Sequence, residues 1–223
     1  MVKELVFATS NGPILGTYNV TKSVVITTSN GHIDINVNAF NHDTSRPTSI
    51  TATTKNGYVN SICLSISVNS FYRRIDVNTS LYYTGEPVPE LHSSSHGLPK
   101  NSNGTFALDF ITSNGGIAVD FKEAPIGNAL SLSTTLSNAD VDISLHPTYE
   151  GKVNAVFGSN GAVKIDAKEP KTEDPTGRGR ERVVDIKRVW TGIVTGTIAW
   201  DTNSQKRGEL AMTSSNGACT LHI

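Results

Sequence analysis

Aspartates are the residues of this sequence whose spacing could support chemistry. Five of them fall on the polar side of segments that alternate apolar and polar residues: Asp34, Asp120, Asp140, Asp142 and Asp166. If those segments are strands of one sheet, a row of carboxylates could hold Ca²⁺ or perform acid–base work. Lys122 and Lys164 interrupt the row, so we favour ordinary solvated strand faces.

Other signatures of catalysis or metal binding are weak. His92 and His96 have the spacing of two ligands on one helix face, but they lie in a Ser-rich stretch with no helical pattern, which favours a surface loop. The sequence contains no Gly-x-Ser-x-Gly, no phosphate-binding Gly-rich loop and no Cys-x-x-Cys. We therefore predict no catalytic residues, no metal ligands and no cofactor.

Aromatic residues are the better candidates for binding. Exposed rings beside Asn, Ser and Thr suit sugars, which need a flat apolar face with hydrogen bonds around its edge. The predicted ligand-binding residues are Phe71, Tyr72, Tyr82 and Tyr83, and Tyr58 lies near another loop. The alternative is that these rings cap the core.

The elements that must position these residues repeat along the chain. Each copy centres on Asn-Gly or a variant of it, and the Asn residues are Asn11, Asn30, Asn56, Asn114, Asn138, Asn160 and Asn216. Apolar residues follow at alternate positions, as in Ile117, Val119 and Phe121, and precede each Asn by four and six residues, as in Phe110 and Leu108. This period of two predicts a half-buried strand on each side of every turn. Asn-Gly also tolerates positive φ, which favours tight reversals.

The spacing of the copies favours one fold class. Several successive Asn residues are about 20–25 residues apart, which is typical of a β-solenoid or β-helix whose copies stack in ladders. An antiparallel β-sandwich is the alternative. We predict a single elongated all-β domain over 1–223, with an irregular insertion at 66–107 and a charged loop at 168–188. Strands resume at 183–186 and 192–200.

Composition limits the classes of partner and the compartments that we expect for this chain. Only 17% of residues are charged and the net charge is −1, so no strong field favours nucleic acid. No apolar run is long enough to span a bilayer, and no secretory signal precedes the first strand. The sequence as written predicts a cytoplasmic protein, or a surface or secreted one if the N-terminus is trimmed. Cys63 and Cys219 fall on inward positions and are expected to be free core residues.

The last copy ends at Ile223, the final residue. A terminal strand without a neighbour exposes unpaired backbone groups. Either the charged segment covers this strand or another chain does, and we predict self-association into a homo-oligomer through terminal strands.

Several motifs resemble an uncharacterised fungal β-domain family related to adhesins of the β-solenoid type. They are His146–Gly151, Asp174–Arg180, Gly196–Trp200 and Thr213–Gly217. The resemblance implies an adhesin-like β-solenoid and carries no catalytic residues. We expect a non-enzymatic recognition or structural module whose partners are glycans bound in a lectin-like manner. The alternatives are a polysaccharide-active enzyme of the parallel β-helix type, which uses outward aspartates with nearby arginine or lysine, and a self-assembling structural protein.

Overall fold

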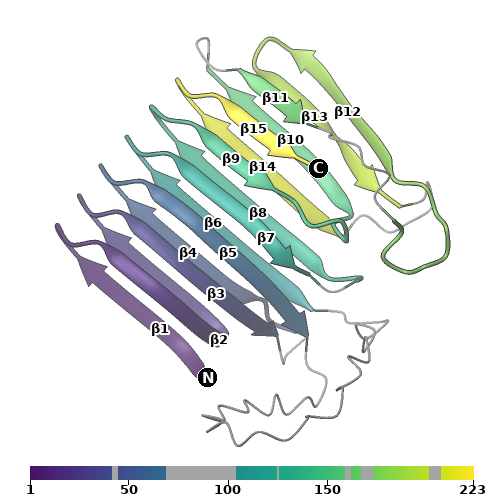
Figure 1. The fold of residues 1–223 in the computed structure, drawn as a ribbon. Helices are drawn as coiled ribbons and strands as arrows, with labels where there is room; N and C mark the ends of the chain where they lie inside the picture. Colours follow the sequence, from purple (N-terminus) through teal and green to yellow (C-terminus); the bar gives the residue numbers. More distant parts are fainter. Residues whose placement is uncertain (42–44, 69–103, 125, 159–161, 167–172, 201–206) are drawn as a thin grey trace, which may run out of the picture.

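The chain folds into two facing layers of β-strands (Figure 1). The structure, a computed structural model, describes residues 1–41, 45–68, 104–124, 126–158, 162–166, 173–200 and 207–223, and for 60–68 we describe the backbone alone. Every helix or strand in these ranges is a β-strand, which confirms the predicted all-β class. The neighbours are parallel except at one end, so the antiparallel sandwich is wrong.

We call the first layer sheet A. It ends in two antiparallel neighbours, because β13 pairs antiparallel with β10 and β12 pairs antiparallel with β13. Its strands in spatial order are β1 (Val2–Thr9), the second half of β2 (Ile14–Thr28), β4 (Thr48–Thr54), β6 (Thr105–Thr112), β8 (Ala129–Leu136), β14 (Gly208–Ser214), β10 (Gly151–Phe157), β13 (Ile193–Ala199) and β12 (Val183–Trp190).

The second layer, sheet B, contains parallel neighbours alone within the described residues. It starts at the first half of β2, so this one long strand belongs to both sheets. The strands that follow in spatial order are β3 (Ile33–Asn41), β5 (Val59–Val68), β7 (Ile117–Glu123), β9 (Val141–Ser144), β15 (Cys219–His222) and β11 (Val163–Asp166).

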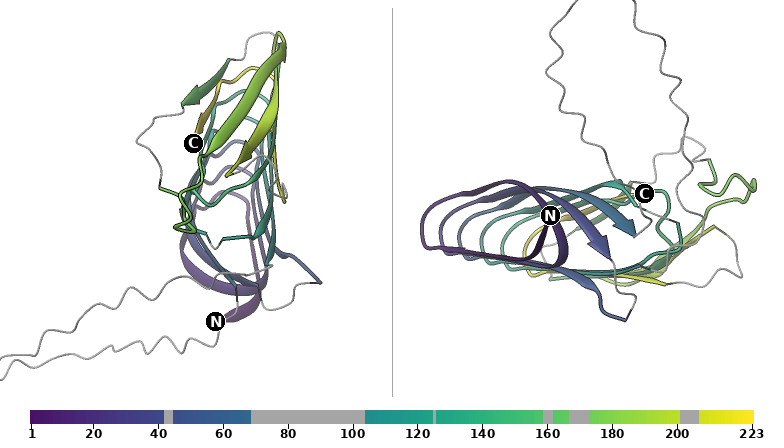
Figure 2. Two further views of the ribbon diagram at one scale, coloured as in Figure 1. Left: turned by 90° about the vertical axis from the view of Figure 1, so that its right-hand side faces the viewer. Right: turned by 90° about the horizontal axis from the view of Figure 1, so that it is seen from below.

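Each repeat is a strand of sheet A followed by a strand of sheet B, and an Asn-Gly-type turn joins them wherever the connecting residues are described, which excludes 159–161 between β10 and β11. Figure 2 shows the two layers face to face, with the turns stacked along one edge. The alternation puts apolar side chains between the layers, and equivalent residues pair in register, as Val24, Ile50 and Leu108 do in sheet A. All three are buried, which confirms the predicted inward face.

The turn asparagines also form a ladder. The Nδ2 group of Asn30 donates to Oδ1 of Asn11 at 2.6 Å, and Asn56 donates to Asn30 in the same way at 2.7 Å. Asn114, Asn138 and Asn216 continue the series at 2.8–2.9 Å. The predicted ladder of like residues is therefore present.

The role predicted for the turn glycines is wrong. Among the described glycines, positive φ occurs at Gly16, Gly127, Gly177, Gly179 and Gly192, and none of these belongs to an Asn-Gly turn. Close approach of the neighbouring turn requires glycine instead at Gly31, Gly57, Gly115 and Gly217. A Cβ on Gly57 would lie 1.9 Å from the carbonyl oxygen of Gly31, and one on Gly115 would lie 1.9 Å from that of Gly57.

Two predictions, one about the order of the strands and one about their register, need correction. The copy that ends at Ile223 does not close the stack, because β14 lies between β8 and β10, and β15 lies between β9 and β11. In β5, an irregularity between Val59 and Ile62 shifts the pairing, so Cys63 pairs with Asp120 instead of Phe121. Cys63 therefore does not hold the register position of Phe121 that the alignment on Asn assigns to it, whereas Cys219 is buried and free as predicted.

The two predicted irregular segments are described in part. Strand β5 ends at Val68 and β6 begins at Thr105, so most of the 66–107 insertion lies outside the described residues. The strands predicted at 183–186 and 192–200 are confirmed by β12 and β13, so the charged loop ends before Val183 and not at Arg188. Within the described residues, we find no helix long and apolar enough to cross a membrane.

Candidate functional site

The predicted ligand-binding aromatics Phe71, Tyr72, Tyr82 and Tyr83 lie outside the described residues, as do His92 and His96. Tyr58 is described, and it occupies an exposed position two residues after a turn Asn. Its side chain is 49% exposed and stacks on the ring of His32, with centroids 5.1 Å apart and an interplanar angle of 16°. These two rings form an aromatic platform at the edge of sheet B.

A shallow hollow lies beside this platform because the next repeat has small residues there. Gly116 holds the position equivalent to Tyr58, and Ala118 follows it on β7. The repeat beyond presents Asp140 and Asp142, and Ala118 pairs with Asp142. Tyr58, Val59, Gly116, Ile117, Ala118, Asp140 and Asp142 line the hollow.

Backbone spacing sets the width of the hollow. Val59 pairs with Ile117, and Ile117 pairs with Val141, so the Tyr58 wall and the aspartate wall are two strand spacings apart. Two spacings correspond to about 10 Å. An aromatic ring on one side and carboxylates on the other thus flank a floor of small residues.

Polar contacts with the C-terminal repeat hold the aspartates beside the hollow in place. Oδ1 of Asp140 accepts a hydrogen bond of 2.7 Å from the backbone N–H of Ala218. Oδ1 of Asp142 lies 3.1 Å from Nε2 of His222, and Oδ2 of Asp166 lies 3.5 Å from Nδ1 of the same ring. The C-terminal repeat therefore orients both aspartates, because Ala218 and His222 belong to its turn and to β15.

Part of the predicted aspartate row is brought together in this way. Asp142 and Asp166 meet at His222, and Asp140 lies in the same hollow as Asp142. Asp34 pairs with Asn60 on β5, and Asp120 forms an ion pair with Lys122. Among the described side chains, no three His, Cys, Asp or Glu residues are arranged to hold a metal ion.

The arrangement can recognise a polyhydroxylated ring. An aromatic face stacks on the apolar face of such a ring, and carboxylate oxygens accept hydrogen bonds from its hydroxyl groups. Sequence reasoning named Tyr58 and the two aspartates in separate arguments and did not bring them together. Aligning the second residue after each Asn gives the available signal: His32, Tyr58, Gly116 and Asp140 are consecutive in the stack.

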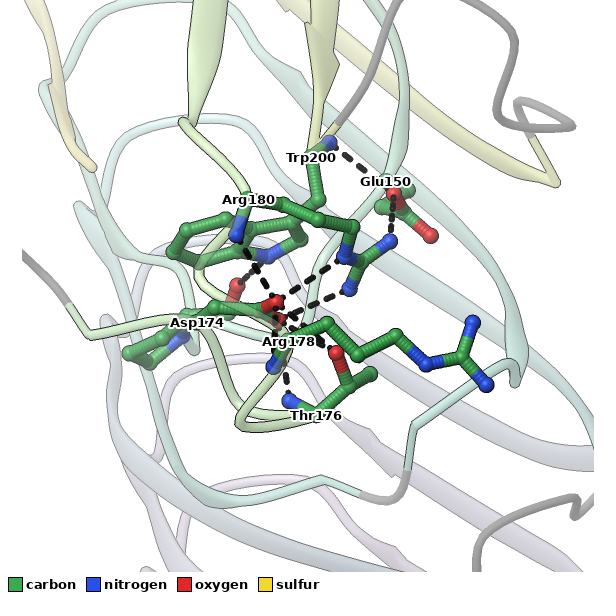
Figure 3. Close-up of polar contacts among 7 residues, drawn as sticks. Glu150, Asp174, Thr176, Arg178, Arg180 and Trp200 are labelled. Atoms are coloured by element: carbon green, nitrogen blue, oxygen red, sulfur yellow. Dashed lines mark hydrogen bonds and ion pairs between the residues drawn. The ribbon is translucent and has the colours of Figure 1, made fainter.

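A second polar cluster lies around Asp174 (Figure 3). The carboxylate of Asp174 is 2% exposed and accepts hydrogen bonds from the hydroxyl and the N–H of Thr176 and from the N–H of Arg178. The Arg180 guanidinium donates to it from Nε at 3.1 Å and from Nη2 at 2.9 Å. These contacts, led by Arg180, hold the pKa of Asp174 well below its usual range.

Arg180 joins this loop to the sheets. Figure 3 shows its guanidinium between Asp174 and Glu150, and its Nη1 lies 3.8 Å from Oε1 of Glu150. The same Glu150 oxygen accepts a hydrogen bond of 2.9 Å from the backbone N–H of Trp200. The indole N–H of Trp200 donates to the Pro147 carbonyl at 2.8 Å. Asp174 is ionised and fully engaged, so the cluster fastens residues 174–180 and is not suited to proton transfer.

Comparisons with protein-family models, with curated proteins and with solved structures gave no match. The resemblance to the adhesin-like family therefore stays a prediction from the sequence.

Proposed function

We propose that this chain is a non-enzymatic, adhesin-like recognition module that binds carbohydrate on a β-solenoid scaffold. The observation that supports the proposal is the exposed Tyr58 ring, which faces Asp140 and Asp142 across a floor of small residues. Lectin-like sites combine these two features, a flat apolar surface and fixed polar groups around it.

The scaffold supports the same proposal. Parallel in-register repeats with a shared turn ladder are the arrangement expected of a solenoid, in which each repeat contacts its neighbours. Such a stack holds residues of successive repeats at fixed spacing. Tyr58 and Asp142 are therefore positioned before a ligand arrives, which lowers the entropic cost of binding.

The exposure of Asp142 favours binding over hydrolysis. A general acid for glycoside hydrolysis keeps its proton at neutral pH because its site is apolar and buried. Asp142 is 58% exposed at its side chain and is paired with His222. A polysaccharide-active enzyme is the alternative, because Asp142, Asp166 and His222 do lie within reach of one another.

Binding to an array of glycans and to insoluble cell-wall polysaccharides tests the proposal. We expect saturable binding by the wild type and at least about tenfold weaker binding by Tyr58→Ala, the size of effect that loss of a stacked aromatic ring produces. Asp142→Asn should also weaken binding. Leu15→Ala is the matched control, since Leu15 is exposed on the same sheet but lies outside the hollow.

Three outcomes decide between the alternatives. Binding that is unchanged in Tyr58→Ala but lost in a Tyr82→Ala, Tyr83→Ala double variant would move the site to the insertion. Release of soluble reducing ends that Asp142→Asn abolishes would support the enzyme. Absence of binding to every glycan, with the circular dichroism spectrum of a folded protein, would refute the carbohydrate proposal.

A further inference from the structure

Strand β12 is an exposed edge at the far end of sheet A. Within the described residues it pairs with β13 alone, so its other backbone edge has no strand partner. Figure 1 shows it at the end of the stack opposite β1. Exposed apolar side chains lie along it, with Val184 39%, Val189 65% and Trp190 74% exposed. An open edge with apolar side chains is a template for pairing with another strand.

The two faces of β12 differ in chemistry. Val184, Ile186 and Arg188 pair with Ile198, Gly196 and Val194, and the buried Ile198 and Val194 show that this is the core-facing side. Asp185 and Lys187 pair with Thr197 and Thr195 on the outer side, where their charged groups lie 3.1 Å apart. The strand is therefore apolar at its centre on one face and carries both signs of charge on the other.

Symmetry limits how two copies of β12 can pair. Antiparallel pairing of one strand with its own copy requires a two-fold axis perpendicular to the sheet. Residues that face each other across the axis must then lie on the same face of the sheet. The axis therefore lies midway between the two copies of one residue, and that residue faces its own copy. If the central residue were Asp185 or Lys187, it would face its own copy and place identical charges opposite each other, which is unfavourable.

The remaining central residue, Ile186, gives a complementary register. Residues equidistant from Ile186 face one another, so Asp185 lies opposite the partner's Lys187, and Lys187 lies opposite the partner's Asp185. The two Ile186 side chains meet on the core-facing side. The regular alternation of β12 holds to Arg188, where an irregularity precedes Trp190. Val189 and Trp190 then lie at the rim of the pairing.

We propose that β12 is an interface for a second copy of this chain, paired antiparallel about Ile186. Charge complementarity favours a second copy as the partner. The sequence Val-Asp-Ile-Lys-Arg pairs opposite charges when Ile186 is central, and it does not when Asp185 or Lys187 is central. The interface joins sheet A of the two copies into one continuous sheet. It places self-association at β12 and not at the C-terminal strand β15, which already has a neighbour on each side.

Charge reversal tests the register in the full chain. We expect the wild type to dimerise with rising concentration in sedimentation-velocity runs, and Asp185→Lys and Lys187→Asp each to weaken dimerisation by about tenfold or more, because each puts two like-charged pairs across the axis. An equimolar mixture of the two variants should dimerise again, since two lysines in one copy then face two aspartates in the other. Glu4→Lys is the matched control, because it reverses one exposed charge at β1.

The equimolar mixture distinguishes pairing of Asp185 with Lys187 across the axis from a general effect of net charge on dimerisation. A wild type that is monomeric at every concentration would refute the interface. Dimerisation that persists in both single variants, or a mixture that stays monomeric while its components dimerise poorly, would refute the register. Ile186→Lys, which places two like charges on the axis, gives a second readout. Circular dichroism of each variant shows that the fold is kept.

Discussion

At the scale of single residues, Asp174 is a buried carboxylate held by a dense set of hydrogen bonds. It accepts hydrogen bonds from three backbone N–H groups, a hydroxyl and a guanidinium within a short loop. Asp-Pro-Thr-Gly is a turn sequence, and an Asp at its start can accept from the N–H groups that follow. The sequence thus contains the signal for the turn, whereas the arrangement of Glu150 and Trp200 around Arg180 comes from packing.

This carboxylate predicts a dependence of stability on pH. The folded-state pKa of Asp174 is lowered from 3.8, chiefly by Arg180, so the folded chain binds this proton less readily than the unfolded chain. The stability that the carboxylate contributes is therefore present above about pH 4 and is lost as the pH falls further. We expect Asp174→Asn to lower the free energy of unfolding by about 1–3 kcal/mol at pH 7.

Urea denaturation at pH 7 and pH 3 measures the effect. The difference between wild type and Asp174→Asn should shrink at the lower pH, while Asp34→Asn, at a strand position without this cluster, should show a small difference at both. A difference that is constant with pH would contradict the role assigned to the ionised carboxylate.

At the scale of elements, a hydroxyl residue three positions before the turn glycine, Thr54 or Thr112 and Ser214 in the last repeat, ties one repeat to the next. The hydroxyl of Thr112 accepts from the N–H of Gly115 and donates to the carbonyl of Gly57, each at 3.1 Å. Thr54 makes the same pair of bonds with Gly57 and Gly31. Both threonines are buried, so their hydroxyls satisfy backbone groups that water does not reach.

Replacing this hydroxyl by a methyl group keeps the shape and removes both hydrogen bonds. We expect Thr112→Val to lower the free energy of unfolding by about 2 kcal/mol or more, because two buried backbone groups lose their partner. Thr135→Val is the matched control on the exposed side of β8, and it should change stability by about 0.5 kcal/mol or less. Equal effects in urea denaturation would show that the turn hydroxyl is not structural.

At the scale of the whole molecule, the last repeat in the sequence lies inside the stack. Leu210 on β14 pairs with Leu132 on one side and Val153 on the other, and it is fully buried. Leu5 on β1 holds the equivalent position in the first repeat, where sheet A has one neighbouring strand, and it is partly buried. Substitutions of Leu210 and Leu5 therefore compare the packing of an interior repeat with that of a terminal repeat.

Truncating each leucine distinguishes these positions. We expect Leu210→Ala to lower the free energy of unfolding by about 2–5 kcal/mol, since it opens a cavity between two packed repeats. Leu5→Ala should cost less than half as much, because its surroundings are already open to water. Urea denaturation of the two variants is the measurement, and a larger loss for Leu5→Ala would contradict the interior placement of β14.

The sequence by itself determined the local features of this fold. Alternation at Ile117, Val119 and Phe121 assigns the inward face, because successive side chains of a strand point to opposite sides. The recurrent Asn-Gly turns assign the repeats and their register beside each turn, although the irregularity in β5 was not visible in the spacing. Both signals lie within a few residues of each other, so neither needs tertiary contacts to be recognised.

Only the tertiary structure decided how the repeats are ordered and what they bring together. Parallel backbone ladders form between any two repeats of similar pattern, so no local signal directs β14 and β15 between β8–β9 and β10–β11. The hollow depends on that order, because Tyr58, Gly116 and Asp142 come from three repeats and His222 comes from a fourth. The site is thus a property of the stack, since its residues meet through hydrogen-bonded neighbours and not through spacing along the chain.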